Sequence, residues 1–155
     1  MDQLLIRKAT IADLTQLYSF EQGVIEAERP FDPTIKNGFI HYYDLAEMIT
    51  ASDVEVVVAE INNQLIGSGY ARIEKARHYL KHENHAYLGF MYVHPAYRGR
   101  GINSSIIQAL KDWALSQHIT EIRLDVYADN TAAIRAYEKT GFTKHLIEMR
   151  LDADE

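Results

Sequence analysis

Two arginines alternate with two glycines in the segment Val93-His-Pro-Ala-Tyr-Arg-Gly-Arg-Gly-Ile-Asn103. An apolar stretch precedes this segment and an amphipathic one follows it, which predicts a strand, a short loop and the start of a helix. Gly99 and Gly101 lack a Cβ atom, so the backbone can turn sharply and approach a ligand closely. The first N–H groups of the helix have no partner within it and carry the positive end of its dipole. The pattern therefore indicates either a cradle for an anion, most naturally phosphate, or a plain turn with solvated arginines.

A second segment further along reads Leu124-Asp-Val-Tyr-Ala-Asp-Asn-Thr-Ala-Ala-Ile-Arg-Ala-Tyr-Glu-Lys-Thr-Gly-Phe142. Residues 122–127 are β-rich, Asp129 or Asn130 is the expected N-cap of a helix, and Gly141 is expected to end that helix at the C′ position. Taken alone, Asn130 is interpreted as a cap and Tyr137 as a partly buried aromatic residue.

Together, the two segments resemble the GNAT superfamily of acyl-CoA-dependent N-acyltransferases. The first is similar to its pyrophosphate loop, Arg/Gln-x-x-Gly-x-Gly/Ala, through Arg98, Gly99, Arg100 and Gly101. The second is similar to its Asn-x-x-Ala-x-x-x-Tyr-x-x-x-Gly-Phe pattern, through Asn130, Ala133, Tyr137, Gly141 and Phe142. Asn103 stands where the family usually has a small Gly or Ala. Asn suits a helix N-terminus, so we interpret this departure as a change in local contacts.

The resemblance implies acetyl-CoA as co-substrate and a set of residues that bind it. Main-chain N–H groups of Met91 and Val93 are expected to polarise the thioester carbonyl, an oxyanion-type role that side chains do not reveal. Tyr137 is the expected catalytic residue, because a phenol of pKa ~10 can protonate a thiolate whose conjugate acid has a pKa of ~8.5. The alternative for Tyr137 is core packing beside Ile134 and Phe142. The implied binding set is Met91, Val93, Arg98, Gly99, Arg100, Gly101, Ile102, Asn103, Ser104, Asn130, Ala133 and Tyr137.

The group that removes the proton of the attacking amine is left open. An alkylammonium of pKa ~10.4 must lose a proton before it attacks. Several family members carry a carboxylate on the strand before the loop, but Tyr87-Leu-Gly-Phe-Met-Tyr-Val93 contains none. A chain of waters is as good a candidate as any side chain; the side chains considered are Glu21, Glu26, Glu74, His85 and His94.

Composition sets the class of protein. The chain has 155 residues, 47% hydrophobic and 25% charged, which is ordinary for one globular domain. No apolar run reaches the ~18 residues of a membrane span, and the N-terminus lacks the basic and apolar regions of a secretion signal. The absence of cysteine excludes disulfides and a cysteine acyl-enzyme, and fits a cytoplasmic protein. A net charge of −6 argues against non-specific binding to nucleic acid or anionic membrane and suits a cationic acceptor.

The order of elements predicts an α/β fold with a mixed, twisted central sheet of six to seven strands flanked by about four helices. Residues 1–151 are expected to form one acyltransferase domain, followed by an acidic tail at 152–155. Met149 and Leu151 alternate with Arg150, which is typical of a half-buried final strand. The expected strands are 4–9, 54–60, 65–74, 86–93, 121–127 and 142–151, with helices from Thr10 or Asp13, over 42–50, after Gly101 and after Asn130.

The expected activity is transfer of an acetyl group from acetyl-CoA directly to an amine in a ternary complex. The alternative is a CoA-binding module that senses or scaffolds without turnover. Residues 22–43 and the nearby 75–85 segment are expected to shape the acceptor side, which favours a small amine or a protein amino group over an aminoglycoside. No metal, nucleic acid or membrane partner is expected, since His78, His82 and His85 lack an obvious fourth ligand, and a homodimer is allowed.

Overall fold

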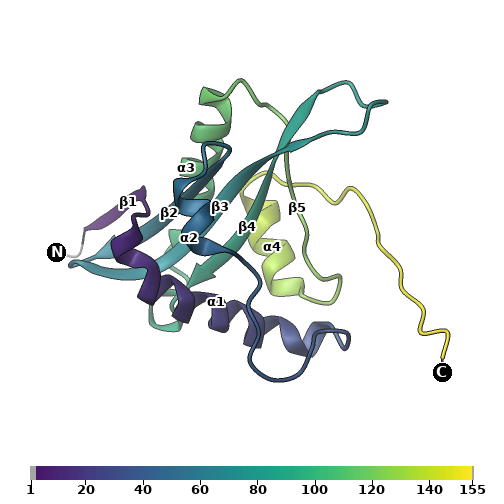
Figure 1. Ribbon diagram of the computed structural model, residues 1–155, viewed down its shortest axis with the longest axis horizontal. Coiled ribbons are helices and arrows are strands. Elements are labelled where there is room, and N and C mark those ends of the chain that lie inside the picture. The colour runs from purple at the N-terminus through teal and green to yellow at the C-terminus, as the bar shows by residue number, and fades with distance from the viewer. Residues whose placement is uncertain (1–2, 155) are drawn as a thin grey trace. The chain divides into compact units, whose positions relative to one another are not determined.

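The computed structural model describes residues 3–154 and forms two compact units. The first unit ends at Asp125 and the second begins at Val126. The first unit holds the sheet and three of the four α-helices, and the second holds the remaining helix (Figure 1). None of the helices within residues 3–154 is long and apolar enough to cross a membrane.

A five-stranded sheet forms the middle of the first unit, in the spatial order β1-β2-β3-β4-β5. The first four strands are antiparallel, and β5 runs parallel to β4. Asn62 and Asn63 both adopt positive φ angles, 52° and 62°, and make the tight β2–β3 turn that the sequence predicts. The strands are β1 (Leu4–Lys8), β2 (Val54–Ile61), β3 (Gln64–Lys75), β4 (Asn84–Val93) and β5 (Ile122–Leu124).

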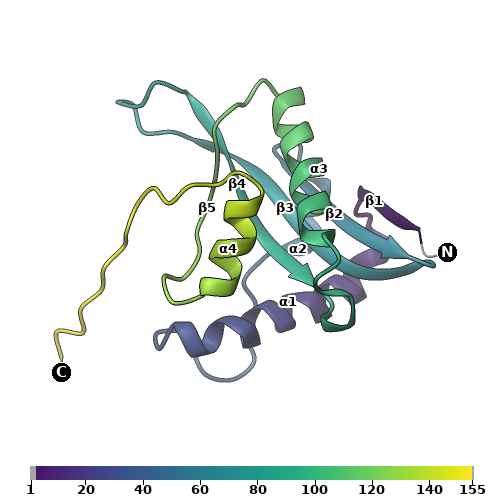
Figure 2. The same cartoon turned by 180° about the vertical axis from the view of Figure 1, so that it is seen from behind.

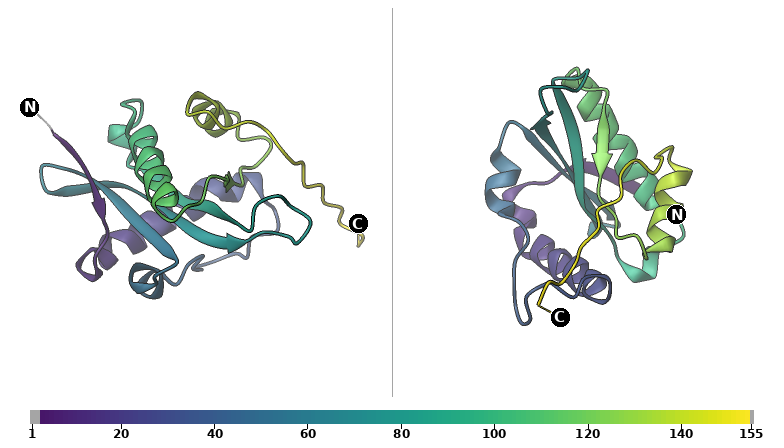
Figure 3. Two further views of the ribbon diagram at one scale, coloured as in Figure 1. Left: turned by 90° about the horizontal axis from the view of Figure 1, so that it is seen from above. Right: turned by 90° about the vertical axis from the view of Figure 1, so that its right-hand side faces the viewer.

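Helices cover both faces of this sheet. Two of them, α1 (Leu14–Glu28) and α2 (Leu45–Thr50), lie on one face, and α3 (Ile102–Ser116) lies on the other (Figures 2 and 3). Buried side chains of α1, α2, β2, β3 and β4 form the main core, which includes Leu17, Phe20 and Phe90. Three short 3₁₀ turns complete the unit: η1 (Ile11–Asp13), η2 (Arg29–Phe31) and η3 (Pro95–Tyr97).

The helix after the glycine loop lies unusually close to the sheet. A Cβ atom at Gly69 of β3 would stand 2.7 Å from Ile106 Cγ2 and 3.3 Å from Leu110 Cδ1. Both side chains belong to the apolar stripe of α3 and are fully buried. Gly69 therefore lets α3 pack closely against β3. This contact helps to fix the N-terminal end of α3, which follows the glycine loop.

The second unit contains α4 (Thr131–Lys139), and its ends confirm the predicted caps. The Asn130 side chain accepts a hydrogen bond from the Ala133 N–H at 3.2 Å. Gly141 follows the helix with φ of +106°, and its N–H donates to the Glu138 carbonyl. The Phe142 N–H donates to the Tyr137 carbonyl, which completes a Schellman motif.

The predicted final strand at 142–151 is wrong, and the described sheet has five strands where six to seven were expected. Residues 142–151 form neither helix nor strand. The apolar residues from Leu146 onward are exposed, from 82% for Ile147 to 89% for Met149. An alternating pattern forms a strand only where a neighbour supplies backbone hydrogen bonds, and no strand pairs with this segment in the described chain. The strand expected at 121–127 likewise ends at Leu124. The mixed α/β sheet and the four α-helices agree with the prediction.

Candidate functional site

The predicted loop follows β4 directly and begins with a short 3₁₀ turn. His94 caps this turn through its Nδ1 atom, which accepts a hydrogen bond from the Ala96 N–H at 3.1 Å. Pro95 occupies the first position of the turn, where its lack of an N–H is harmless. The chain then runs extended through Arg98 into the two glycines and enters α3 at Ile102.

Both glycines of the loop have left-handed backbone conformations, with φ of +79° at Gly99 and +76° at Gly101. A Cβ atom at either position would meet nothing within 4 Å, so open space adjoins the backbone on this side. Gly101 is also the N-cap of α3, and the first N–H groups of that helix lack acceptors within the helix. Exposed backbone donors, open space and the positive end of a dipole meet here, which is what a pyrophosphate requires.

The two arginines take different roles from each other. Arg98 folds back across the loop, and its Nε donates to the Val93 carbonyl at 3.0 Å, so it also braces the loop. The guanidinium of Arg100 lies 5.1 Å from the centre of the Tyr97 ring in a cation–π contact. Both arginine side chains are exposed, and both keep a positive charge beside the open glycine backbone.

The end of β4 has no strand partner on the side away from β3 among the described residues. The His94 N–H donates to the Ile66 carbonyl at 2.7 Å, and Val93 lies opposite Gly67. N–H groups alternate sides along a regular strand, so the N–H of Val93 points away from β3. The role of the Met91 N–H stays a prediction, because residue 91 lies where the β3–β4 register is irregular. On that side β5 pairs with β4 only as far as Leu88, so residues 89–93 have no partner strand there among the described residues.

The pairing of β4 with β3 is irregular at residues 90 and 91. The register of β3 against β4 shifts between Ser68 and Tyr70, and Phe90 has a φ of +56°, a strained value for a bulky residue. Two side chains stabilise this conformation of Phe90. The buried Ser68 hydroxyl donates to the Phe90 carbonyl at 3.0 Å, and the Phe90 backbone forms a hydrogen bond with the Tyr43 hydroxyl.

Replacing Ser68 by alanine is expected to lower the free energy of unfolding by about 1–2 kcal/mol, because a buried carbonyl loses its donor. Urea denaturation measures this change. Ser116→Ala is the matched control, since its hydroxyl donates to a carbonyl in exposed surroundings and should have almost no effect. An equal effect of both substitutions would show that Ser68 does not hold the irregular stretch.

A group of phenols and charges that sequence reasoning missed lies on the α1–α2 face of the sheet. Arg72 of β3 pairs in register with Tyr87 of β4, and its guanidinium contacts the rings of Tyr70 and Tyr87. The Tyr87 hydroxyl donates to Asp125, just after β5, at 3.2 Å. Burial is the main cause that raises the pKa of both phenols, with Asp125 adding to it. The sequence does contain a signal for this group of side chains. Tyr70 and Arg72 are two residues apart in a predicted strand, so their side chains lie on the same face of the sheet.

The side chains that the sequence offers as acceptors of the amine's proton lie in different surroundings. Glu26 is exposed and pairs with Arg29 at 2.9 Å, while Glu74 lies between Arg72 and His85. His94 serves as the cap of η3. Glu21 is fully buried and already hydrogen-bonded to other groups, so these contacts give it a structural role.

Glu21 holds the segment that leads into α2. One carboxylate oxygen accepts the N–H groups of Tyr42 and Tyr43, both at 2.9 Å, and the other contacts His41 Nδ1 at 2.7 Å. The next residue, Gln22, donates to the Ile40 carbonyl at 2.9 Å. These bonds fix the expected acceptor side against α1. Elsewhere in that region a hydrogen bond joins Glu28 to Tyr42, and burial raises the pKa of the Glu28 carboxyl.

Glu21→Leu is expected to lower the free energy of unfolding by about 3 kcal/mol, because two buried backbone N–H groups lose their acceptor. Glu21→Gln keeps an oxygen in place and should cost about 1 kcal/mol. Guanidinium denaturation of both variants, beside the exposed Glu26→Leu on the same helix, gives the comparison. Equal stability of Glu21→Leu and Glu26→Leu would contradict this role.

The remaining predicted residues belong to the second unit. Asn130 and Ala133 form the N-cap of α4, and the Tyr137 ring contacts the Phe142 ring at 5.9 Å. The local interpretation of Asn130 as a cap is thus confirmed. The assignment of Tyr137 to the departing thiolate stays a prediction. Within residues 3–154 no three His, Asp or Glu side chains gather in a way that could hold a metal ion.

Comparison with known proteins gives the family. A model of the acetyltransferase (GNAT) family matches residues 12–142. An acetyltransferase of Pectobacterium atrosepticum is 36% identical over 83 residues, which cover 54% of this chain and 53% of that protein. The chain thus spans about half the length of the curated relatives it matches.

Solved structures share the fold at low sequence identity. A predicted acetyltransferase with acetyl-CoA from Clostridium acetobutylicum has a TM-score of 0.72 and 22% identity, covering 97% of this chain and 96% of that chain. An aminoglycoside N-acetyltransferase in complex with CoA has a TM-score of 0.73 and 18% identity, covering 96% of this chain and 100% of that one. Because the family model matches most of its length, from residue 12 to residue 142, the chain belongs to the GNAT family of acetyltransferases.

Proposed function

We propose that this protein is an acetyl-CoA-dependent N-acetyltransferase that transfers the acetyl group directly to an amine in a ternary complex. The observation that carries the proposal is the loop at 98–104, where two left-handed glycines face open space at the N-terminus of α3. The end of β4, which has no strand partner beyond Leu88 on the β5 side among the described residues, adjoins this loop in the chain. The zero cysteine count removes the usual covalent relay, and it suits a cytoplasmic protein.

The residues divide the chemistry into three tasks. Backbone N–H groups of residues 99–104 bind the pyrophosphate, with Arg98 and Arg100 adding charge. The N–H groups of Met91 and Val93 donate to the thioester oxygen as negative charge develops on it. The Tyr137 hydroxyl donates its proton to the sulfur as the C–S bond breaks, while the amine nitrogen forms the new bond to the carbonyl carbon.

The amine must arrive without its extra proton. Asp125 stands directly after β5, next to the place where β4 continues without that partner, and it accepts a hydrogen bond from Tyr87. We assign Asp125 as the carboxylate that receives the proton, through water, and passes it to solvent. The acceptor is a small amine or a protein amino group, which the acidic and aromatic residues of the 22–43 region suit.

The test is incubation with acetyl-CoA and a panel of polyamines, amino acids, N-terminal peptides and aminoglycosides. We expect release of free CoA thiol in equal amount to acetylated amine. Micromolar CoA binding without turnover on any amine would favour a sensor or scaffold instead, and turnover of a hydroxyl or thiol acceptor alone would overturn the amine assignment.

A further inference from the structure

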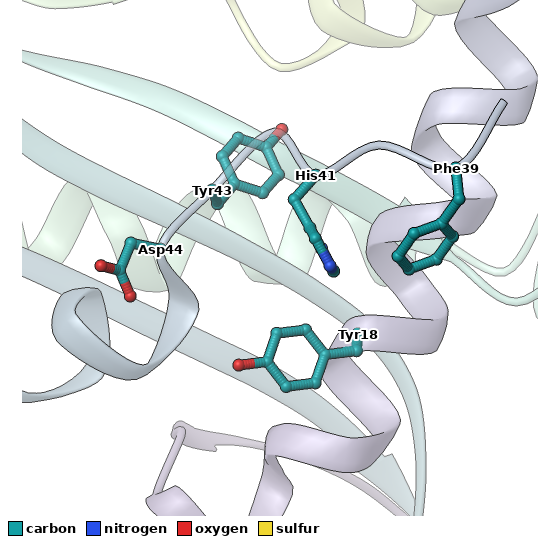
Figure 4. Close-up of a pocket in the computed structure, with 5 residues that line it drawn as sticks. All are labelled: Tyr18, Phe39, His41, Tyr43 and Asp44. Atoms are coloured by element: carbon teal, nitrogen blue, oxygen red, sulfur yellow. The ribbon is translucent and has the colours of Figure 1, made fainter. Parts of the chain in front are cut away.

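An open pocket of about 480 Å³ lies between α1 and the segment that leads into α2, apart from the loop after β4 (Figure 4). Four of its five lining residues are aromatic: Tyr18, Phe39, His41 and Tyr43. The fifth is Asp44, the N-cap of α2. A volume of this size accommodates a small organic ligand.

The aromatic walls are held in place before any ligand arrives. The His41 ring makes edge-to-face contacts with Phe39 at 4.9 Å and with Tyr18 at 5.8 Å, and Glu21 fixes the imidazole through Nδ1. Arg29 donates to the carbonyls of Lys36 and Gly38 at 2.7 and 2.6 Å, which anchors the stretch that carries Phe39. A pocket so fixed loses little conformational entropy when it binds.

The exposure of these rings also needs an explanation. The Phe39 side chain is 75% exposed, and Tyr18 is 38% exposed on the outer side of α1. Single exposed aromatic residues are common on protein surfaces, but a group of them around a pocket is typical of a binding site.

The charge of the pocket selects the kind of ligand. One Asp44 oxygen accepts the Glu47 N–H of the cap at 3.3 Å, and no donor among residues 3–154 bonds to the second oxygen. No Lys or Arg lines the pocket, and the one basic ring, His41, faces the buried Glu21 carboxylate. An anion would therefore meet the Asp44 carboxylate with no Lys or Arg beside it, and a neutral apolar ligand would take water from Asp44 without replacing it.

We propose that this pocket binds an organic ammonium group, held by the faces of the aromatic rings and by Asp44. Aromatic rings attract cations through their quadrupole, and alkylated ammonium groups lose little hydration when they enter such a site. Phe39, His41 and Tyr43 belong to the 22–43 region, so this inference rests on the proposed acceptor side and specifies what holds the cation there. Binding is measured without acetyl-CoA, so a failure to bind the ammonium group and a failure of acyl transfer are distinguished.

The experiment compares choline with 3,3-dimethylbutan-1-ol, which has the same shape and no charge. Titration of each into the whole protein without acetyl-CoA, followed by NMR, gives the two affinities. We expect choline to bind about fivefold more tightly than the neutral compound. Equal affinity of the two compounds, or no binding of choline, would overturn the proposal.

Two substitutions locate the site. Phe39→Leu keeps an apolar side chain but removes a ring, and Asp44→Asn keeps the cap but removes the charge. Each is expected to weaken choline binding about threefold. Leu115→Ala, at an exposed apolar residue of α3 outside the pocket, should leave it unchanged. Choline binding that survives both pocket substitutions unchanged would place the ligand elsewhere and contradict the proposal.

Discussion

Tyr137→Phe is expected to lower kcat about 100-fold, while the affinity for CoA changes little. The phenol supplies the proton that the departing sulfur takes up, and phenylalanine has none to give. The expected fall in kcat is small for the loss of a general acid, because a thiolate is already a fair leaving group without protonation. Steady-state rates and calorimetric titration of CoA measure the two quantities separately.

Phenylalanine at position 137 retains the ring that contacts Phe142 and the backbone carbonyl that accepts the Phe142 N–H. Tyr79→Phe is the matched control, since that exposed tyrosine belongs to the 75–85 segment and has no assigned role in the acid step. An unchanged kcat, or a fall in kcat that a loss of CoA binding explains, would remove Tyr137 from the chemistry.

Gly101→Val is expected to weaken CoA binding by about 100-fold, and Arg100→Ala by only about threefold. The valine meets two penalties: a φ of +76° that costs an L-residue about 1–2 kcal/mol, and a side chain in the open space that the pyrophosphate needs. Arg100 is one of several contacts and lies exposed over Tyr97. Calorimetric titration of CoA into each variant measures the difference.

Gly38→Val is the control that separates backbone strain from steric exclusion of the pyrophosphate. Gly38 has a φ of +82° and also faces open space, but it lies in the segment before α2. Its substitution should strain the backbone equally and leave CoA binding unchanged. A larger loss from Arg100→Ala than from Gly101→Val would contradict a cradle made mainly by backbone groups.

Local signals in the sequence predicted the parts of the site that local chemistry determines. Gly101 starts α3, Asn130 caps α4 and Gly141 ends it, each because one residue type satisfies backbone groups within a few positions. The Asn62-Asn63 turn followed for the same reason.

Features that depend on distant partners could not be predicted in this way. Residues 142–151 alternate like a strand, yet a strand exists only with a neighbour to pair with, and the described sheet offers none to them. The contact between Tyr87 and Asp125 depends on the parallel pairing of β4 with β5, which the sequence does not display.

Glu21 illustrates the limit for side chains. Its place on the apolar stripe of α1 beside Leu17 and Phe20 signals burial, and the sequence offers it as one candidate for the proton acceptor. Its partners are backbone N–H groups of residues 42 and 43, and no residue type in the sequence marks such groups. The role of Ser68 is equally invisible in the sequence, since its partner is a backbone group, the Phe90 carbonyl.

The most direct measurement of the proposed reaction is the initial rate with acetyl-CoA and the best amine varied together. Direct transfer in a ternary complex predicts double-reciprocal lines that intersect, and no acetylated protein in the mass spectrum. Parallel lines together with a transient acetyl-enzyme would show a covalent relay and contradict direct transfer.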